Sequence, residues 1–115
     1  MVVEAKMYAM ADKYELDGLK EVAKTRFAEA LKRSYDTEEF VVAVETVYST
    51  TPDSDRGLRD IVTAFTWSRQ ETLLARKDVQ SLLNYLDAFS KDLVQEICRK
   101  ASSRTPAEPR RYWGE

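Results

Sequence analysis

The residue types that most often carry catalysis or bind metals are scarce in this chain. Histidine, the commonest general base and metal ligand, is absent, and there is one cysteine, Cys98. A nucleophilic thiol needs a neighbouring base, and the sequence identifies none for Cys98. The cysteine falls on the apolar stripe of the last expected helix, so we expect a small buried side chain. A single cysteine also excludes an internal disulfide, which fits a reducing compartment.

Acidic residues occur in two suggestive patterns, and neither one completes a site. The Asp-Ser-Asp segment 53–55 could begin a calcium loop, but the required turn glycine would be Leu58 and the bidentate acid would be Ala64. Glu38 and Glu39 are adjacent on an expected helix and point about 100° apart, so they do not converge as paired catalytic carboxylates do. No glycine-rich phosphate loop occurs. We therefore expect no catalytic residue, no metal site and no cofactor.

Aromatic residues suggest binding rather than catalysis. Trp67 lies off the apolar stripe of its expected helix, so it is either a partly buried edge residue or a binding anchor, because tryptophan is enriched in interface hot spots. Near the end of the chain, cations and aromatics mix in Arg110, Arg111, Tyr112 and Trp113. Such a mixture can stack on single-stranded nucleic acid or dock as a peptide. The alternative is an unstructured end.

Length and composition favour one helix-rich domain. The chain has 115 residues, of which 43% are hydrophobic and 33% are charged, with a net charge of −2. Residues 99–115 hold five basic and two acidic residues, so a basic tail follows a mildly acidic body. The sequence lacks a secretory signal pattern, an N-glycosylation acceptor and any apolar run of the roughly 18 residues that a membrane span needs. We expect a soluble intracellular protein, cytoplasmic or nuclear, that does not enter a membrane.

The elements that must position these residues are helices. Glycine and proline number three each, and strand-like alternation is absent. The apolar spacing predicts helices over 2–15, 17–34, 36–50, 53–75, 78–86 and 87–101, with the clearest break around Pro52. The expected fold is all-α, an irregular bundle of about six helices over 1–101, followed by a flexible basic tail over 102–115.

The first expected helix is apolar on two sides. One stripe consists of Val3, Met7, Met10, Ala11 and Tyr14. The other strip consists of Val2, Ala5 and Ala9. A helix with two apolar sides needs a neighbour on each, and an element at the start of the chain has few neighbours available. We therefore expect a second copy or a protein partner to cover one side. The candidate partner-binding residues are Val2, Ala5, Met7, Tyr8, Ala9, Met10 and Trp67.

Two segments resemble a known family. Residues 7–23, MYAMADKYELDGLKEVA, resemble the C-terminal part of BTB/POZ domains, especially fungal ones, in the pattern Y-x-x-A-D-K-Y-x-(I/V/L)-x-x-L-K-x-x-A. Residues 47–60 are similar to the region that follows in many fungal BTB proteins. The resemblance implies that 1–34 correspond to the last BTB helices and 35–101 to the helical extension after them. Asp17 replaces a common family proline, and the sheet-bearing half that covers the first helix in the family is not in this sequence.

The resemblance implies a non-catalytic protein–protein interaction module. We expect it to self-associate or to dock a protein partner through apolar helix faces. Because some BTB proteins present substrates to cullin-3 ubiquitin ligases, an alternative is a substrate-adaptor fragment that contacts a cullin. A hypothesis of another class is nucleic-acid binding through the basic tail, against which the acidic body argues.

Overall fold

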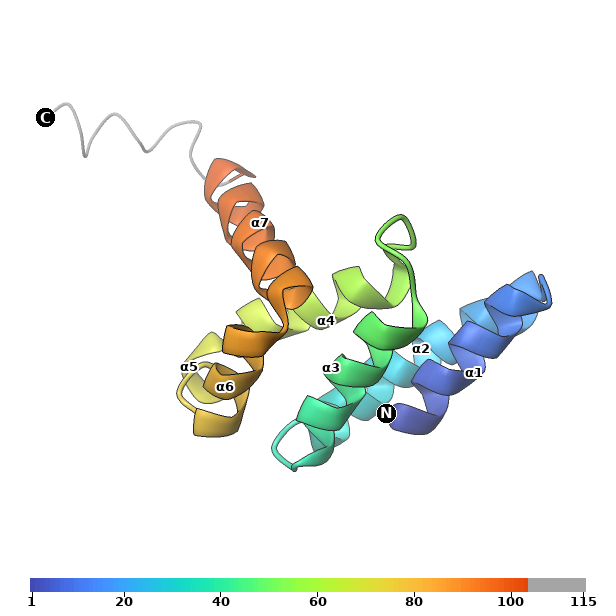
Figure 1. Cartoon of the computed structure of the whole chain (residues 1–115), viewed down its shortest axis with the longest axis horizontal. Helices are drawn as coiled ribbons and strands as arrows, with labels where there is room; N and C mark the ends of the chain where they lie inside the picture. The colour runs from blue at the N-terminus through green and yellow to red at the C-terminus, as the bar shows by residue number, and fades with distance from the viewer. Residues whose placement is uncertain (104–115) are drawn as a thin grey trace, which may run out of the picture.

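The computed structural model describes residues 1–103, and all regular secondary structure within them is helical. The helices are α1 (Val2–Lys13), α2 (Asp17–Ser34), α3 (Glu39–Thr50), α4 (Gly57–Ser68), α5 (Gln70–Leu73), α6 (Lys77–Tyr85) and α7 (Asp87–Ser103). They form an irregular bundle of 55 × 31 × 25 Å (Figure 1). The predicted all-α fold is confirmed. Of the tail predicted over 102–115, residues 104–115 lie outside the described part of the chain.

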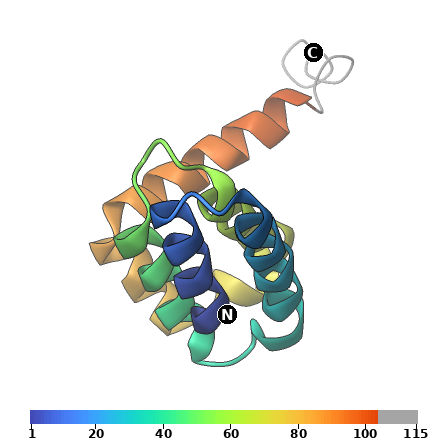
Figure 2. The same cartoon turned by 90° about the vertical axis from the view of Figure 1, so that its right-hand side faces the viewer.

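Helices α1 and α2 form an antiparallel hairpin, and α1 also packs against α3. Figure 2 shows α1 between the other two helices. The hairpin turns through Glu15, whose φ of 58° lies in the left-handed region, and the Leu16 N–H donates to the Ala11 carbonyl at 2.8 Å. Aromatic side chains of α2 and α3, Phe27 and Phe40, are fully buried at the centre of this half. Their burial is the main apolar gain that holds the three helices together.

Helix α4 crosses the bundle and packs against α7, while α5 and α6 lie at one side of the bundle (Figure 1). Buried leucines and valines of α4, α5 and α6 join Phe89 of α7 in the same core cluster as the first three helices. Figure 1 shows the C-terminal half of α7 extending away from the rest of the bundle. None of the described helices combines the length and the apolar character that crossing a bilayer requires.

The helix predicted over 53–75 is divided in the structure. Residues 52–56 form a loop, and α4 begins only at Gly57, where the Asp55 carboxylate accepts the Gly57 N–H at 3.2 Å. The helix stops at Ser68, and the short α5 then returns Leu73 to the core, where it is fully buried. Tertiary packing therefore overrides a local preference for one long helix.

The prediction that Cys98 is a buried side chain was wrong. Cys98 and Val94 of α7 are exposed, because α7 packs on α4 through the side that carries Asp92 and Leu93. Leu19 and Val22 of α2 are also exposed. The buried face of α2 is centred on Ala23, Phe27, Ala30 and Leu31. Leu19 and Val22 lie at the edge of that face.

Candidate functional site

Helix α1 is covered on one side by its own chain and is apolar and open on the other. The covered side presents Ala5, Tyr8 and Ala11 to α2 and α3, and all three are buried. The open side presents Val3, Met10 and Tyr14, which are 66%, 58% and 61% exposed. Large apolar side chains with this exposure, aligned on one face of a helix, mark a surface that another molecule can cover.

The open side has the spacing of a helix-pairing stripe. We define the α1 seam as Val3, Met7, Met10 and Tyr14, whose separations are four, three and four residues. This is the a/d spacing by which one helix packs along another. Met7 is half-buried and packs against the core, so it joins the seam to the chain's own core. At 1.5 Å per residue the seam runs for about 17 Å.

The turn between α1 and α2 and the start of α2 carry two further exposed apolar residues. Leu16 and Leu19 are both exposed beside Tyr14 in the sequence, at the end of the hairpin. Figure 1 shows this end of the hairpin at one extremity of the bundle, away from α5, α6 and α7. The surface is therefore unobstructed by the described part of the chain.

A polar contact behind the seam fixes the orientation of α1. The Tyr8 hydroxyl donates to the Asp55 carboxylate at 2.6 Å, and the ammonium of Lys20 lies 3.6 Å from the other oxygen of Asp55. Burial and then the bond to Asp55 raise the pKa of Tyr8 to about 12. Burial works against the ionised form of Asp55, but its hydrogen bonds and the Lys20 charge outweigh burial and lower its pKa. The contact ties α1 to α2 and to the loop before α4.

A second polar cluster joins α3, α4 and α7. The Tyr48 hydroxyl donates to Asp92 at 2.6 Å, and the Arg56 guanidinium lies 2.9 Å from the same carboxylate oxygen. Burial and this hydrogen bond raise the pKa of Tyr48 well above its usual value. The buried Arg59 donates to the Thr51 carbonyl at 2.5 Å, and its guanidinium lies 4.4 Å from the centre of the Tyr48 ring. The cluster positions the loop that leads into α4.

The groove between α4 and α7 is charged and has a volume of about 180 Å³. Its carboxylates are largely paired: Asp60 and Asp92 with Arg56, and Glu96 with Arg99. One buried oxygen of Glu96 has no hydrogen-bond donor, although the Lys100 ammonium lies 4.0 Å away. Within the described residues no three histidine, cysteine or acidic side chains gather to hold a metal ion. These charges attach α7 to α4.

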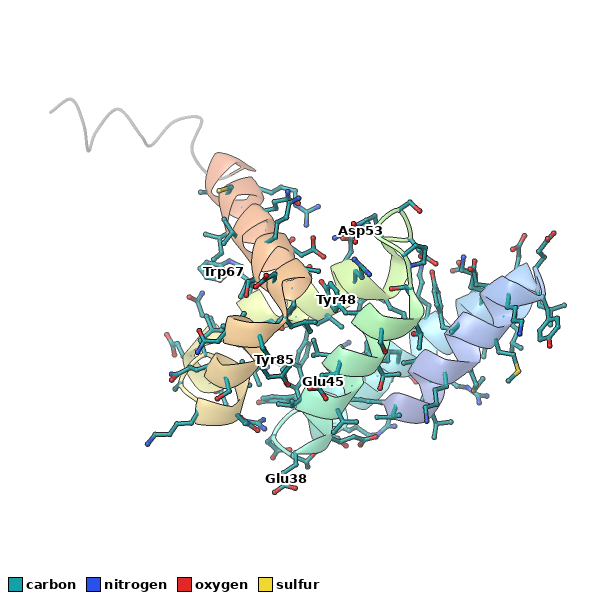
Figure 3. All side chains as sticks on the ribbon, in the orientation of Figure 1. Glu38, Glu45, Tyr48, Asp53, Trp67 and Tyr85 are labelled. Carbon is teal, nitrogen blue, oxygen red and sulfur yellow. The ribbon has the colours of Figure 1, made fainter. Side chains whose placement is uncertain are left out.

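Trp67 does not join the α1 face. Figure 3 shows Trp67 beside α7, while α1 lies at the other end of the bundle. Its side chain is half-buried, in agreement with the edge-residue interpretation. In the same view Tyr85 of α6 points toward Glu45 of α3, to which its hydroxyl donates a hydrogen bond that raises the pKa of Tyr85. Tyr85 therefore connects α6 to α3.

The predicted partner-binding residues divide into three groups. The prediction that Ala5 and Tyr8 bind a partner was wrong, because both side chains are buried against α2 and α3. Val2, Met7 and Ala9 are half-buried, and Met10 is exposed. The predicted tail motif, Arg110, Arg111, Tyr112 and Trp113, lies outside the described residues, so nucleic-acid binding through the tail stays a prediction.

Sequence reasoning missed four exposed residues as partner contacts, Val3, Tyr14, Leu16 and Leu19. Tyr14 was detectable, because it continues the seam spacing. Comparison with protein-family models, with curated proteins and with solved structures finds no match for this chain. The resemblance to BTB/POZ domains therefore stays a prediction.

Proposed function

We propose that this chain is a non-catalytic protein–protein interaction module that docks a partner through the α1 seam. The observation that carries the proposal is the exposure of Val3, Met10 and Tyr14 on one side of α1, while Ala5, Tyr8 and Ala11 on the other side are buried. The resemblance of residues 7–23 to the C-terminal part of BTB/POZ domains supports the same class of function.

The docking mode that fits the seam is helix against helix. A partner helix with apolar residues three and four positions apart would cover the seam over about three turns. Two of the four seam residues, Met7 and Met10, are methionines, whose flexible side chains adapt to differently shaped partners. Burial of apolar area supplies the attraction, and the cost of association cancels much of it, so the contact is reversible.

The test compares two exposed apolar residues on different helices. Light scattering over a concentration series reports self-association, and anisotropy of a labelled amphipathic helical peptide with glutamine flanks reports partner binding. We expect at least one of these signals in the unaltered chain. Met10→Asp should remove it, whereas Val94→Asp on α7 should not, although Val94 is also 58% exposed.

Two outcomes contradict the proposal. The absence of both signals at high micromolar concentration would show that the seam binds neither a copy nor a helix. A signal that survives Met10→Asp and disappears in Val94→Asp would assign docking to α7 instead. Circular dichroism of both variants checks that helix content is unchanged.

A further inference from the structure

The open flank of the α1 seam is positively charged. Lys6 and Lys13 are both exposed and immediately precede the seam residues Met7 and Tyr14. Because they are seven residues apart, they project from the same side of α1. Within the described residues neither lysine forms an ion pair, and the Lys13 ammonium lies 5.6 Å from the centre of the Tyr14 ring. Two positive charges therefore border the apolar surface without acidic partners in the described part of the chain.

The other flank of the seam is closed. Glu4 and Ala11 occupy the equivalent positions after Val3 and Met10. Ala11 is completely buried by the rest of the chain, and the Glu4 carboxylate lies 2.8 Å from the Met1 ammonium. An incoming helix therefore meets the seam together with the lysine flank, and its charge on that side matters.

A second copy of the chain fits this arrangement poorly. In an antiparallel two-fold pair of helices each flank meets the same flank of its mate, so Lys6 and Lys13 would face lysines. Like charges placed opposite each other are destabilising. In a parallel pair the lysines would face the closed flank, whose one acid, Glu4, is already paired with the Met1 ammonium.

We infer that the α1 seam binds an acidic amphipathic helix of another protein, whose apolar stripe covers the seam and whose carboxylates pair with Lys6 and Lys13. The inference rests on the proposed function and names the chemistry of the partner. Exposed ion pairs add little affinity, but a positively charged flank speeds the encounter with an acidic helix and disfavours a positively charged one. The apolar seam supplies attraction, and the lysines select the partner.

The experiment uses the whole chain and three synthetic helical peptides of about three heptads, with the same leucine stripe and with glutamate, glutamine or lysine at the flanking positions. Fluorescence anisotropy is measured at low and high salt. We expect the glutamate peptide to bind at least about tenfold more tightly than the lysine peptide, and the difference to shrink at high salt.

Two charge-matched variants locate the effect. Lys6→Glu combined with Lys13→Glu should reverse the order, so that the lysine peptide binds best. Lys77→Glu combined with Lys91→Glu changes the net charge by the same amount on α6 and α7 and should leave the order unchanged. All four lysines are exposed, so helix content by circular dichroism should be retained in both variants.

The outcomes separate this inference from the proposed function. Equal binding of all three peptides, or a preference that Lys6→Glu with Lys13→Glu does not alter, overturns the acidic partner and leaves the docking module intact. Self-association that Met10→Asp abolishes, without binding of any peptide, identifies a second copy as the occupant and overturns it as well. If the chain shows no peptide binding and no self-association, both the acidic partner and the proposed function are overturned.

Discussion

Asp55 is a single residue that connects three helices, α1, α2 and α4. Its carboxylate accepts the Tyr8 hydroxyl of α1 and the first N–H of α4, and it lies close to the Lys20 ammonium of α2. Hydrogen bonds to a charged group are the stronger ones, and a buried donor without an acceptor is costly. The side of α1 opposite the seam is therefore held by a polar bond as well as by apolar packing.

Replacing Tyr8 should measure this bond directly. Tyr8→Phe keeps the buried ring and removes the hydroxyl, so we expect the free energy of unfolding to fall by about 1.5–3 kcal/mol. Urea denaturation followed by circular dichroism gives the value. Tyr14→Phe is the matched control, because that ring is exposed and its hydroxyl has no hydrogen-bond partner in the described structure, and its effect should stay within about 0.5 kcal/mol. Equal effects of the two substitutions would contradict the role of Asp55.

The same pair predicts how stability depends on pH. The folded state lowers the pKa of Asp55 below its ordinary value of 3.8, so its contribution is complete above that value and is lost as the pH falls below it. The folded state raises the pKa of Tyr8 from 10.0 to about 12, so its contribution is lost as the pH rises between these values. Asp55→Asn should flatten the acid limb of a plot of unfolding free energy against pH, and Tyr8→Phe the alkaline limb. Unchanged limbs would show that the contact is not formed in solution.

At the residue scale the sequence predicts apolar contacts better than polar ones. The predicted stripe of Val3, Met7, Met10, Ala11 and Tyr14 follows from spacing on one helix. In the structure Val3, Met10 and Tyr14 are exposed together, Met7 is half-buried and Ala11 is buried. The bond between Tyr48 and Asp92 joins residues 44 positions apart, and no local pattern links them. The burial of Ala5 and Tyr8 could not be predicted from local spacing either, because it depends on where α2 and α3 cross α1.

At the scale of elements, the start of α4 fits closely against the buried Tyr8 of α1. A Cβ on Gly57 would lie 2.3 Å from the Tyr8 hydroxyl oxygen and 3.0 Å from the ring carbon that carries it. The ring belongs to a buried side chain that cannot swing away. The absence of a side chain at Gly57 therefore lets the Tyr8 ring approach the backbone of α4, although alanine is the better helix former.

Two glycine substitutions test this fit. Gly57→Ala should lower the free energy of unfolding by about 1–3 kcal/mol, because the new methyl group displaces Tyr8 from Asp55. Gly18→Ala, near the start of α2, meets no atom within 4 Å and should raise the free energy of unfolding by about 0.4–1 kcal/mol. Thermal and urea unfolding distinguish the two signs. Stabilisation by both substitutions would mean that α1 and α4 are less closely packed than described.

The order and type of the elements were largely predictable, but some boundaries were not. The bounds of α2 agree with the prediction, because its apolar period runs uninterrupted from 17 to 34. The break after Ser68 carries neither glycine nor proline, so no local signal marks it. The buried face of α7 was also misassigned, since Asp92 and Glu96 on that face are stabilised by arginines that the periodicity of α7 cannot reveal.

At the scale of the whole molecule, the two halves of the bundle share one core. Arg76, before α6, donates to the carbonyls of Tyr35 and Thr37 between α2 and α3, at 2.7 and 3.0 Å. The apolar core cluster likewise includes residues from every helix. Elements with a continuous core unfold together in small domains.

Hydrogen exchange should detect this cooperativity. We expect the most protected amides of α2 and α4 to exchange with the same free energy, equal to that of global unfolding, and the last turn of α7 to exchange with a much smaller one. Amides at Phe27 and Val62 are suitable reporters, because both side chains are fully buried. If the exchange free energy for α4 were several kcal/mol below that for α2, the two helices would belong to parts of the bundle that unfold separately.

Helix α7 packs on α4 through Asp92, Leu93 and Glu96, and its last turns extend away from the bundle, so a movement of α4 is transmitted along α7. Its 17 residues reach about 25 Å, so a rotation of about 10° at the base would sweep the tip through roughly 4 Å. The sole thiol of the chain, Cys98, sits exposed on this arm. A spin label or fluorophore coupled there would amplify small movements of α4, with no engineered attachment point.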